Sequence, residues 1–272
     1  MRAPPAPLRP VITFSPFIKQ GIDLMTCNPH SVGGHTCIIV VVDYFTKWAE
    51  AIPTFNNTSK IAALFLFNHV ITHFGVPQTI VTDHGSHFRD HMMVELTSKL
   101  GLRHKNYTPY YPQANGQVGA INKVLVTMLR RMIGVHKTNW HTMLFSALWP
   151  YWTSMKNSTG FTPFQLVYGL EVVLPIECEI PSLKLAVELL PNTTPKEERL
   201  LYLTRLDETC RNAALDNKAH KKRVKVQFDK TVKPWAFSEE DIVLVYDQRH
   251  DDLGAGKIQC LWLVPYIIKR EL

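Results

Sequence analysis

Two aspartates in the first third of the chain stand where carboxylates could do chemistry. Asp23 and Asp83 each lie at the end of an apolar run, and Asp83 precedes the flexible Gly85. A lone aspartate at a strand end is most simply a cap or turn residue, and this explanation suffices for Asp23 alone. Two such carboxylates meeting at one place would repel each other unless a cation lay between them. Cages of this kind hold the divalent ions of phosphodiester chemistry, but the sequence does not show that the two carboxylates meet.

The distribution of apolar residues predicts the elements that would position these aspartates. Apolar and β-branched runs predict strands at residues 18–25, 37–44, 48–53, 79–82 and 103–106. Helical spacing predicts helices at residues 59–74, 90–100, 117–133 and 140–154, with a helical turn at 162–169. This order indicates an α/β fold, with a mixed sheet flanked by helices on both faces.

Two of the predicted helices carry specific expectations for packing. In the helix at 59–74, one face is formed by residues at helical spacing, namely Ile61, Leu64, Phe65, Asn68 and Ile71. A tryptophan group in and beside the helix at 140–154 is predicted to lie in the hydrophobic core, namely Trp140, Trp149 and Trp152.

The segments on either side of this unit differ from it in composition. Residues 1–14 are rich in proline and predict a disordered leader. Residues 171–230 predict an irregular connection and then a long charged helix from Pro195 to about Lys225. Short strands expected at 241–246 and 261–269 indicate that residues 231–272 form part of a small β module that the chain does not complete.

The bulk composition narrows the class of protein and its partners. The net charge of +7 and the pI near 9.1 weakly favour a polyanionic partner. The longest apolar run, Cys37 to Val42, is far shorter than the about 20 residues of a membrane-spanning helix, so no membrane partner is expected. Five scattered cysteines without a CxxC pair predict neither a disulfide framework nor a thiolate zinc site. A reducing compartment, the nucleus or the cytoplasm, is expected.

Several strings of the sequence closely resemble the integrase of gypsy-type LTR retrotransposons. They are Gly21-Ile22-Asp23-Leu24-Met25, Val42-Asp43-Tyr44-Phe45-Thr46-Lys47-Trp48, Thr82-Asp83-His84-Gly85-Ser86-His87-Phe88 and Pro112-Gln113-Ala114-Asn115-Gly116-Gln117-Val118. The resemblance continues through residues 147–149 and 162–169 and extends from about Phe17 nearly to the C-terminus. It implies a retroviral-type integrase catalytic core with an RNase H-like fold at residues 15–170. A helical linker with a basic cluster would follow at 171–230, and a truncated small β-barrel at 231–272.

The resemblance also implies a catalytic set, in which one member is missing. Members of this family use two aspartates and a glutamate, with 35 residues between the last two. Asp23 and Asp83 match the aspartates, and Gly119 stands at the position of the glutamate. Asp23 and Asp83 would hold Mg²⁺ or Mn²⁺, at a site that binds two ions in the family and would hold the second one poorly here. Asp43 and Glu95 are conceivable substitutes for the glutamate, but neither has the right spacing.

Double-stranded DNA ends and target DNA are the partners that the resemblance implies, together with self-association into a homo-oligomer. Lys123 lies four residues after Gly119 and so on the same helical face; a basic residue there touches the DNA end in relatives. The residues expected to contact nucleic acid are Gln113, Asn115, Gln117, Lys123, Arg130, Lys221, Lys222 and Arg223.

Three functions compete at this point. The first is an integrase-type polynucleotidyl transferase domain of a retrotransposon polyprotein, acting in DNA integration but inactive or impaired because of Gly119. The second is a non-catalytic nucleic-acid-binding remnant that keeps the RNase H-like fold. The third is an RNase H-like nuclease with a different third ligand, which would degrade DNA without joining it.

Overall fold

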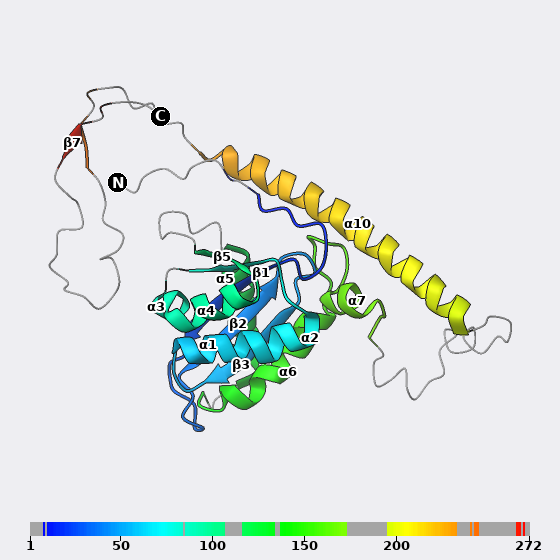
Figure 1. Cartoon of the computed structure of the whole chain (residues 1–272), viewed down its shortest axis with the longest axis horizontal. Helices are drawn as coiled ribbons and strands as arrows, with labels where there is room; N and C mark the ends of the chain where they lie inside the picture. The colour runs from blue at the N-terminus through cyan, green and yellow to red at the C-terminus, as the bar shows by residue number, and fades with distance from the viewer. Residues whose placement is uncertain are drawn as a thin grey trace.

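A five-stranded mixed sheet forms the centre of the molecule (Figure 1). The computed structural model describes residues 8, 10–83, 85–106, 116–133, 137–172, 195–232, 240, 242–244, 265–267 and 269. The strands are β1 (Lys19–Thr26), β2 (Cys37–Asp43), β3 (Ala49–Thr54), β4 (Thr79–Thr82) and β5 (Arg103–Asn106). They lie in the order β3-β2-β1-β4-β5. The β1–β2 and β2–β3 pairs are antiparallel, and the β1–β4 and β4–β5 pairs are parallel. The strands expected at residues 18–25, 37–44, 48–53, 79–82 and 103–106 are confirmed.

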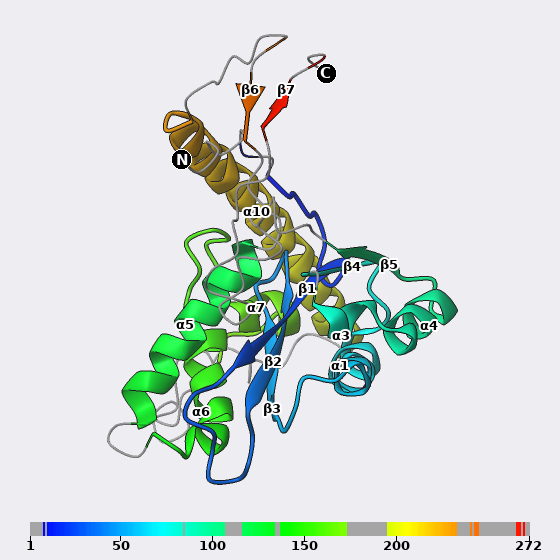
Figure 2. The same ribbon diagram turned by 90° about the vertical axis from the view of Figure 1, so that its left-hand side faces the viewer.

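Helices cover both faces of this sheet (Figure 2). On one face lie α1 (Ser59–Phe65), η1 (Leu66–Ile71), α2 (Thr72–Phe74), α3 (Ser86–Arg89) and α4 (His91–Lys99). On the other lie α5 (Gly116–Ile133) and α6 (Trp140–Thr153). The flanked α/β architecture predicted from the sequence is therefore confirmed.

The interior strand β2 explains why two helical layers are needed. Each of its residues is buried. Ile38 and Val40 pack in one core cluster with residues of α5 and α6. Ile39 and Val41 pack in a second cluster with residues of α1 and η1. Because alternate residues of a strand point to opposite faces, an unbroken apolar run requires cover on both sides.

The helix predicted at 59–74 is present, but its inner face was predicted wrongly in part. Leu66–Ile71 form a π-helix, which has more residues per turn than an α-helix. The apolar stripe is displaced as a result, and it runs through Phe65, Leu66 and Val70. Asn68 is exposed, and Leu64 is 49% exposed.

The tryptophan group is divided between the core and the surface. Trp140 is buried, as predicted. Trp152 is partly buried and stacks on Trp48 with ring centroids 4.6 Å apart. Trp149 is 48% exposed, so its predicted core position was wrong. It lies on the outer side of α6 and packs edge-on against Phe164.

Beyond the sheet, α7 and a long helix complete the described structure. The helix α7 (Pro163–Tyr168) begins at a capping box formed by Thr162 and Gln165. The helix α10 (Pro195–Asp229) contacts the core through Ala213, which packs with Phe45 and Leu166. The strands β6 (Ile242–Val243) and β7 (Tyr266–Ile267) form a two-stranded sheet.

In the described part of residues 231–272, no closed barrel is formed. The division of the chain at residues 14, 170 and 230 stays a prediction. None of the helices described above is long and apolar enough to cross a membrane.

The close approach of α5 to β1 can be tested with a pair of glycine substitutions. A Cβ at Gly21 would meet Val118 Cγ2 at 2.3 Å and Tyr44 Cε1 at 2.8 Å. We expect Gly21→Ala to lower the free energy of unfolding by about 1–3 kcal/mol, because it overpacks the core. At Gly119 an added Cβ meets no neighbouring atom within 4 Å in the described chain. Gly119→Ala should therefore raise the free energy of unfolding, by up to about 1 kcal/mol. Urea denaturation measures the free energy of unfolding of both variants. Equal changes in the two variants would contradict this packing.

Candidate active site

The parallel pairing of β1 with β4 brings Asp23 and Asp83 to neighbouring positions. The register pairs Gly21 with Val81. Continued by two residues along both strands, it places Asp23 beside Asp83. Neighbouring strands lie about 4.7–4.9 Å apart. Gly21 lies against Val118 of α5, and residues two apart share a face of a strand. Both carboxylates therefore lie on the face of the sheet that α5 covers, which the spacing of the sequence could not show.

The environment of Asp23 favours its protonated form. Burial, and then the negative charge of Asp83, raise the pKa of Asp23 to about 6. Two hydrogen bonds act in the opposite direction. Its Oδ1 accepts from the backbone N–H of Leu24 at 2.9 Å, and its Oδ2 accepts from Asn122 Nδ2 at 2.7 Å. The raised pKa therefore reports a site where negative charge is not fully compensated by the protein.

Asp83 is the more accessible of the two carboxylates. Its side chain is exposed, and its Oδ1 accepts a hydrogen bond from the backbone N–H of Gly85 at 3.0 Å. This bond fixes the carboxylate at the start of the loop after β4. One member of the pair is thus half-buried and the other open to an incoming ligand.

Asn122 is a site residue that the sequence reasoning missed. It is 5% exposed on α5, and its amide nitrogen donates to Asp23. Its Oδ1 is buried without a hydrogen-bond partner in the described part of the chain. An asparagine on the inner face of a predicted amphipathic helix, three residues after Gly119, is the signal that could have revealed it.

Position 119 faces the same region but provides no ligand. Residues three apart lie on one face of a helix, so Gly119 shares the face of Asn122, which contacts Asp23. The space beside Gly119 is open, since a Cβ would meet no neighbouring described atom within 4 Å. The described residues therefore do not block a Cβ at this position.

Asp43 and Glu95, the two conceivable substitutes for the glutamate, interact with other groups. Asp43 is buried at the end of β2 and accepts hydrogen bonds from Phe17 N, Phe45 N and both donors of Thr46. It organises the turn between β2 and β3. Glu95 lies on α4, on the other face of the sheet, and pairs with Lys99 at 2.7 Å. Neither carboxylate is directed to Asp23.

The donor set beside Asp23 suits a hard divalent cation but is small. Carboxylate oxygens are the ligands that Mg²⁺ and Mn²⁺ prefer, and the mutual repulsion of Asp23 and Asp83 is what a cation relieves. Among the described residues, no group of three or more His, Cys, Asp or Glu side chains converges to hold a metal. The residues therefore fit one divalent ion held by two carboxylates. Their role as metal ligands stays a prediction.

Some of the residues predicted to contact nucleic acid lie on α5 or just before it, and they differ in solvent exposure. Lys123 and Arg130 are exposed. Gln117 instead donates its Nε2 to the backbone oxygen of Tyr44 at 3.3 Å, which ties its side chain to the core. Gln113 and Asn115 lie outside the described residues.

The basic residues on α10 also differ in whether they are exposed to solvent. Lys222 and Arg223 are exposed on the helix. Lys221 is turned inward, and its Nζ donates to the backbone oxygen of Val11. All three cations were expected to contact nucleic acid, but the helix turns Lys221 toward the core. None of the predicted DNA contacts is tested by this arrangement.

Comparison with known proteins identifies the central domain. Residues 18–112 match the integrase core domain. The Gag-Pol polyprotein of baboon endogenous virus (strain M7) is 30% identical over 155 residues, covering 57% of this chain and 9% of the polyprotein. The Pol polyprotein of Radiation murine leukemia virus (strain Kaplan) is 31% identical over 149 residues, covering 54% of this chain and 25% of the polyprotein. The chain thus spans a quarter or less of the length of these relatives.

A solved structure supports the fold. The simian T-cell lymphotropic virus intasome in complex with PP2A regulatory subunit B56 gamma aligns with a TM-score of 0.53 and 23% identity. The alignment covers 71% of this chain and 65% of that chain. The expected RNase H-like architecture is confirmed, whereas the assignment to gypsy-type elements stays a prediction.

The coupling of the two aspartates can be tested by titration. Asp83→Asn removes a negative charge beside Asp23, so the pKa of Asp23 should fall from about 6 toward its ordinary value. Carboxyl ¹³C NMR measures this shift. Asp43 is the matched control, because burial raises its pKa to about 6 without any contribution from Asp83. A shift of both residues, or of neither, would contradict the geometry described here.

Proposed function

Because the chain carries an integrase core of the retroviral type, we propose that it is an integrase-type polynucleotidyl transferase domain with an impaired metal site. The observation that carries the proposal is the convergence of Asp23 and Asp83 on the face covered by α5, where Gly119 provides no third carboxylate. The reaction would be the transfer of a DNA 3′ end onto a phosphodiester of target DNA.

The chain's own residues would prepare the site for this chemistry. Asp23 and Asp83 would hold a Mg²⁺ or Mn²⁺ ion, and Asn122 would orient the Asp23 carboxylate through its 2.7 Å hydrogen bond. The half-buried position of Asp23 would strengthen electrostatic interactions by excluding water. When bound, a divalent ion supplies charge stabilisation at the phosphoryl group and activates the attacking oxygen.

Gly119 is the reason to propose impairment. A two-ion site needs ligands for both ions, and two carboxylates alone hold the second ion poorly. Even the loss of residues that only support metal ligands typically costs about 10–100-fold in affinity or activity. The loss of a direct ligand should cost at least as much. We therefore expect end processing and strand transfer to be abolished or severely reduced.

The proposal extends to the partners and origin of the chain. DNA ends and target DNA are supported as partners by the net charge of +7 and by exposed Lys123, Arg130, Lys222 and Arg223. Relatives that are polyproteins support an origin within a retrotransposon polyprotein. Self-association rests on the resemblance alone. Free thiols at Cys27, Cys37 and Cys210 support the nucleus or cytoplasm as the compartment.

A non-catalytic nucleic-acid-binding protein is the second candidate, and the absence of a side chain at Gly119 favours it. Both candidates bind DNA through the same exposed cations. They differ in whether any metal-dependent product is formed, so a joining assay separates them.

Restoring the missing carboxylate provides the direct test. In a Mn²⁺-dependent assay with a short duplex oligonucleotide, Gly119→Glu should form at least about 100-fold more nicked and joined product than the unmodified chain. Open space at position 119 permits the substitution. The double variant Gly119→Glu with Asp83→Asn is the control and should be inactive. Efficient joining by the unmodified chain would refute the impairment. Inactivity of folded Gly119→Glu would favour the non-catalytic candidate.

The contribution of Lys123 can be measured separately from catalysis. Lys123→Ala should weaken duplex DNA binding and reduce the dependence of log Kd on log salt concentration by about 1, because one phosphate contact is lost. Fluorescence anisotropy at several KCl concentrations measures this. Lys60→Ala is the matched control, since Lys60 is exposed on α1, on the other face of the sheet. An equal effect of both substitutions would show that Lys123 contributes only to net charge.

A further inference from the structure

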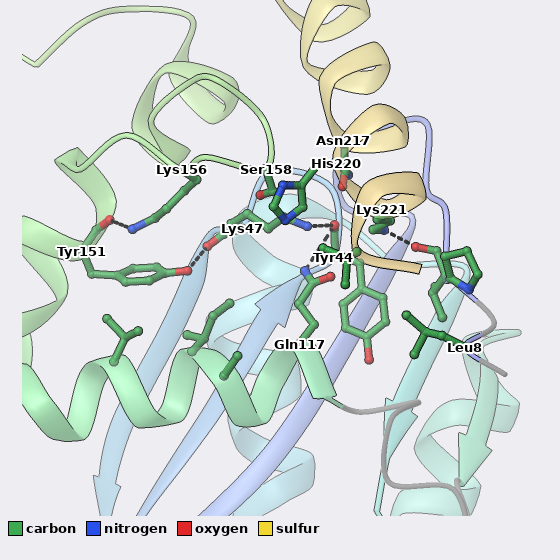
Figure 3. A pocket seen from close by; sticks show the side chains of 16 residues that line it. Leu8, Tyr44, Lys47, Gln117, Tyr151, Lys156, Ser158, Asn217, His220 and Lys221 are labelled. Atoms are coloured by element: carbon green, nitrogen blue, oxygen red, sulfur yellow. Dashed lines mark hydrogen bonds between the residues drawn. The ribbon is translucent and has the colours of Figure 1, made fainter. Parts of the chain in front are cut away.

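A pocket of about 490 Å³ lies between α10 and the core (Figure 3). Neither Asp23 nor Asp83 lines it. Ile121 and Val124 of α5 contribute to one wall, and Asn217, Lys221 and Val224 of α10 to another. Lys47, in the turn between β2 and β3, also lines it. This volume is within the range of about 300–1,000 Å³ found for small-molecule sites.

An amide side chain without hydrogen-bond partners lines the pocket. Asn217 is 2% exposed. Its Oδ1 and its Nδ2 are both buried without a hydrogen-bond partner among the residues that the structure describes. A buried polar group without a partner costs free energy, so this side chain offers both a donor and an acceptor to a ligand.

Cations without acidic partners surround the same space. Lys47 is 6% exposed, and its Nζ donates to the backbone oxygen of Tyr44 at 2.7 Å. Lys221 Nζ donates to the backbone oxygen of Val11. Lys156, also in the lining, donates to the backbone oxygen of Tyr151 at 2.8 Å. Within the described chain, none of these three ammonium groups forms an ion pair with a carboxylate.

Burial lowers the pKa of Lys47 and Lys221, two of these lysines. Burial, and then the charge of Lys221, lower the pKa of Lys47 to about 7, against the opposing effect of Asp43. Burial, and then the charge of Lys19, lower the pKa of Lys221 to about 8. An ammonium group has three donors, and Lys47 and Lys221 each use one of them on a backbone oxygen. The remaining donors are available to an anion.

Part of the pocket lining is apolar. Ile121, Val124 and Val224 present aliphatic side chains. A hydrated inorganic ion would leave these surfaces in contact with water. An anion that carries an apolar body would cover them, and the burial of this area would add to the affinity.

We propose that this pocket binds a small organic anion with one phosphate or carboxylate group attached to an apolar body. The anionic group contacts Lys47, Lys221 and Asn217. The apolar body lies against Ile121, Val124 and Val224. Because these residues belong to α5, α10 and the turn after β2, the ligand holds α10 on the core. Neither Asp23 nor Asp83 lines the pocket, so this binding is independent of the proposed DNA chemistry.

Calorimetric titration of the full chain with 2-naphthyl phosphate and 2-naphthoate tests the proposal. At least one of the two should bind saturably at one site. Lys47→Met and Asn217→Leu should each weaken this binding by about tenfold or more, since each removes a hydrogen bond to a charged group. Lys218→Met is the matched control, because Lys218 is exposed beside Asn217 on α10, and it should bind as the unmodified chain does.

Amide hydrogen exchange provides a second readout that does not depend on the variants. The bound ligand should slow exchange in α10 around Asn217 in the unmodified chain. Absence of saturable binding by both compounds would overturn the proposal, as would equal binding by folded Lys47→Met. It would also be overturned if these variants weakened only the binding of a duplex oligonucleotide, because the pocket would then be a nucleic-acid contact.

Discussion

The parallel pairing of β1 with β4 is the constraint on which the candidate site depends. It brings Asp23, which lies within β1, beside Asp83, which directly follows β4. Burial, and then the negative charge of Asp83, raise the pKa of Asp23. Ile22, Ile39 and Val40 are fully buried in this sheet, and their packing fixes the strand positions from which the carboxylates extend. A divalent cation is the chemical species that would relieve the repulsion between the two carboxylates.

The position of α5 follows from the same strand. Gly21 leaves no Cβ between β1 and Val118, and this contact lets Asn122 reach Asp23. The helix therefore presents position 119 toward the carboxylates. Position 119 is glycine, so α5 adds no carboxylate there to those of Asp23 and Asp83. The opposite side of α5 faces the pocket under α10, so this one helix separates two chemically distinct sites.

Much of the fold was predictable because apolar residues occur in its core segments at the spacing of strands and helices. The unbroken run from Cys37 to Val42 required a strand covered on both faces, and the structure has it. The π-helix Leu66–Ile71 was not predicted, because the spacing that was used assumes 3.6 residues per turn and a π-helix has more. For the site, Asp23 and Asp83 were named from the sequence, but their convergence depends on strand register. Asn122 and the inward turn of Lys221 depend on tertiary contacts that periodicity does not encode.

The most direct test of the central claim is calorimetric titration of Mn²⁺ into the unmodified chain, the Asp83→Asn variant and the Gly119→Glu variant. Two carboxylates in register predict one ion per unmodified chain, loss of that ion in Asp83→Asn, and a second ion in Gly119→Glu. Binding of Mn²⁺ that is unchanged by Asp83→Asn would contradict the account, because the ion would then be held elsewhere on the molecule.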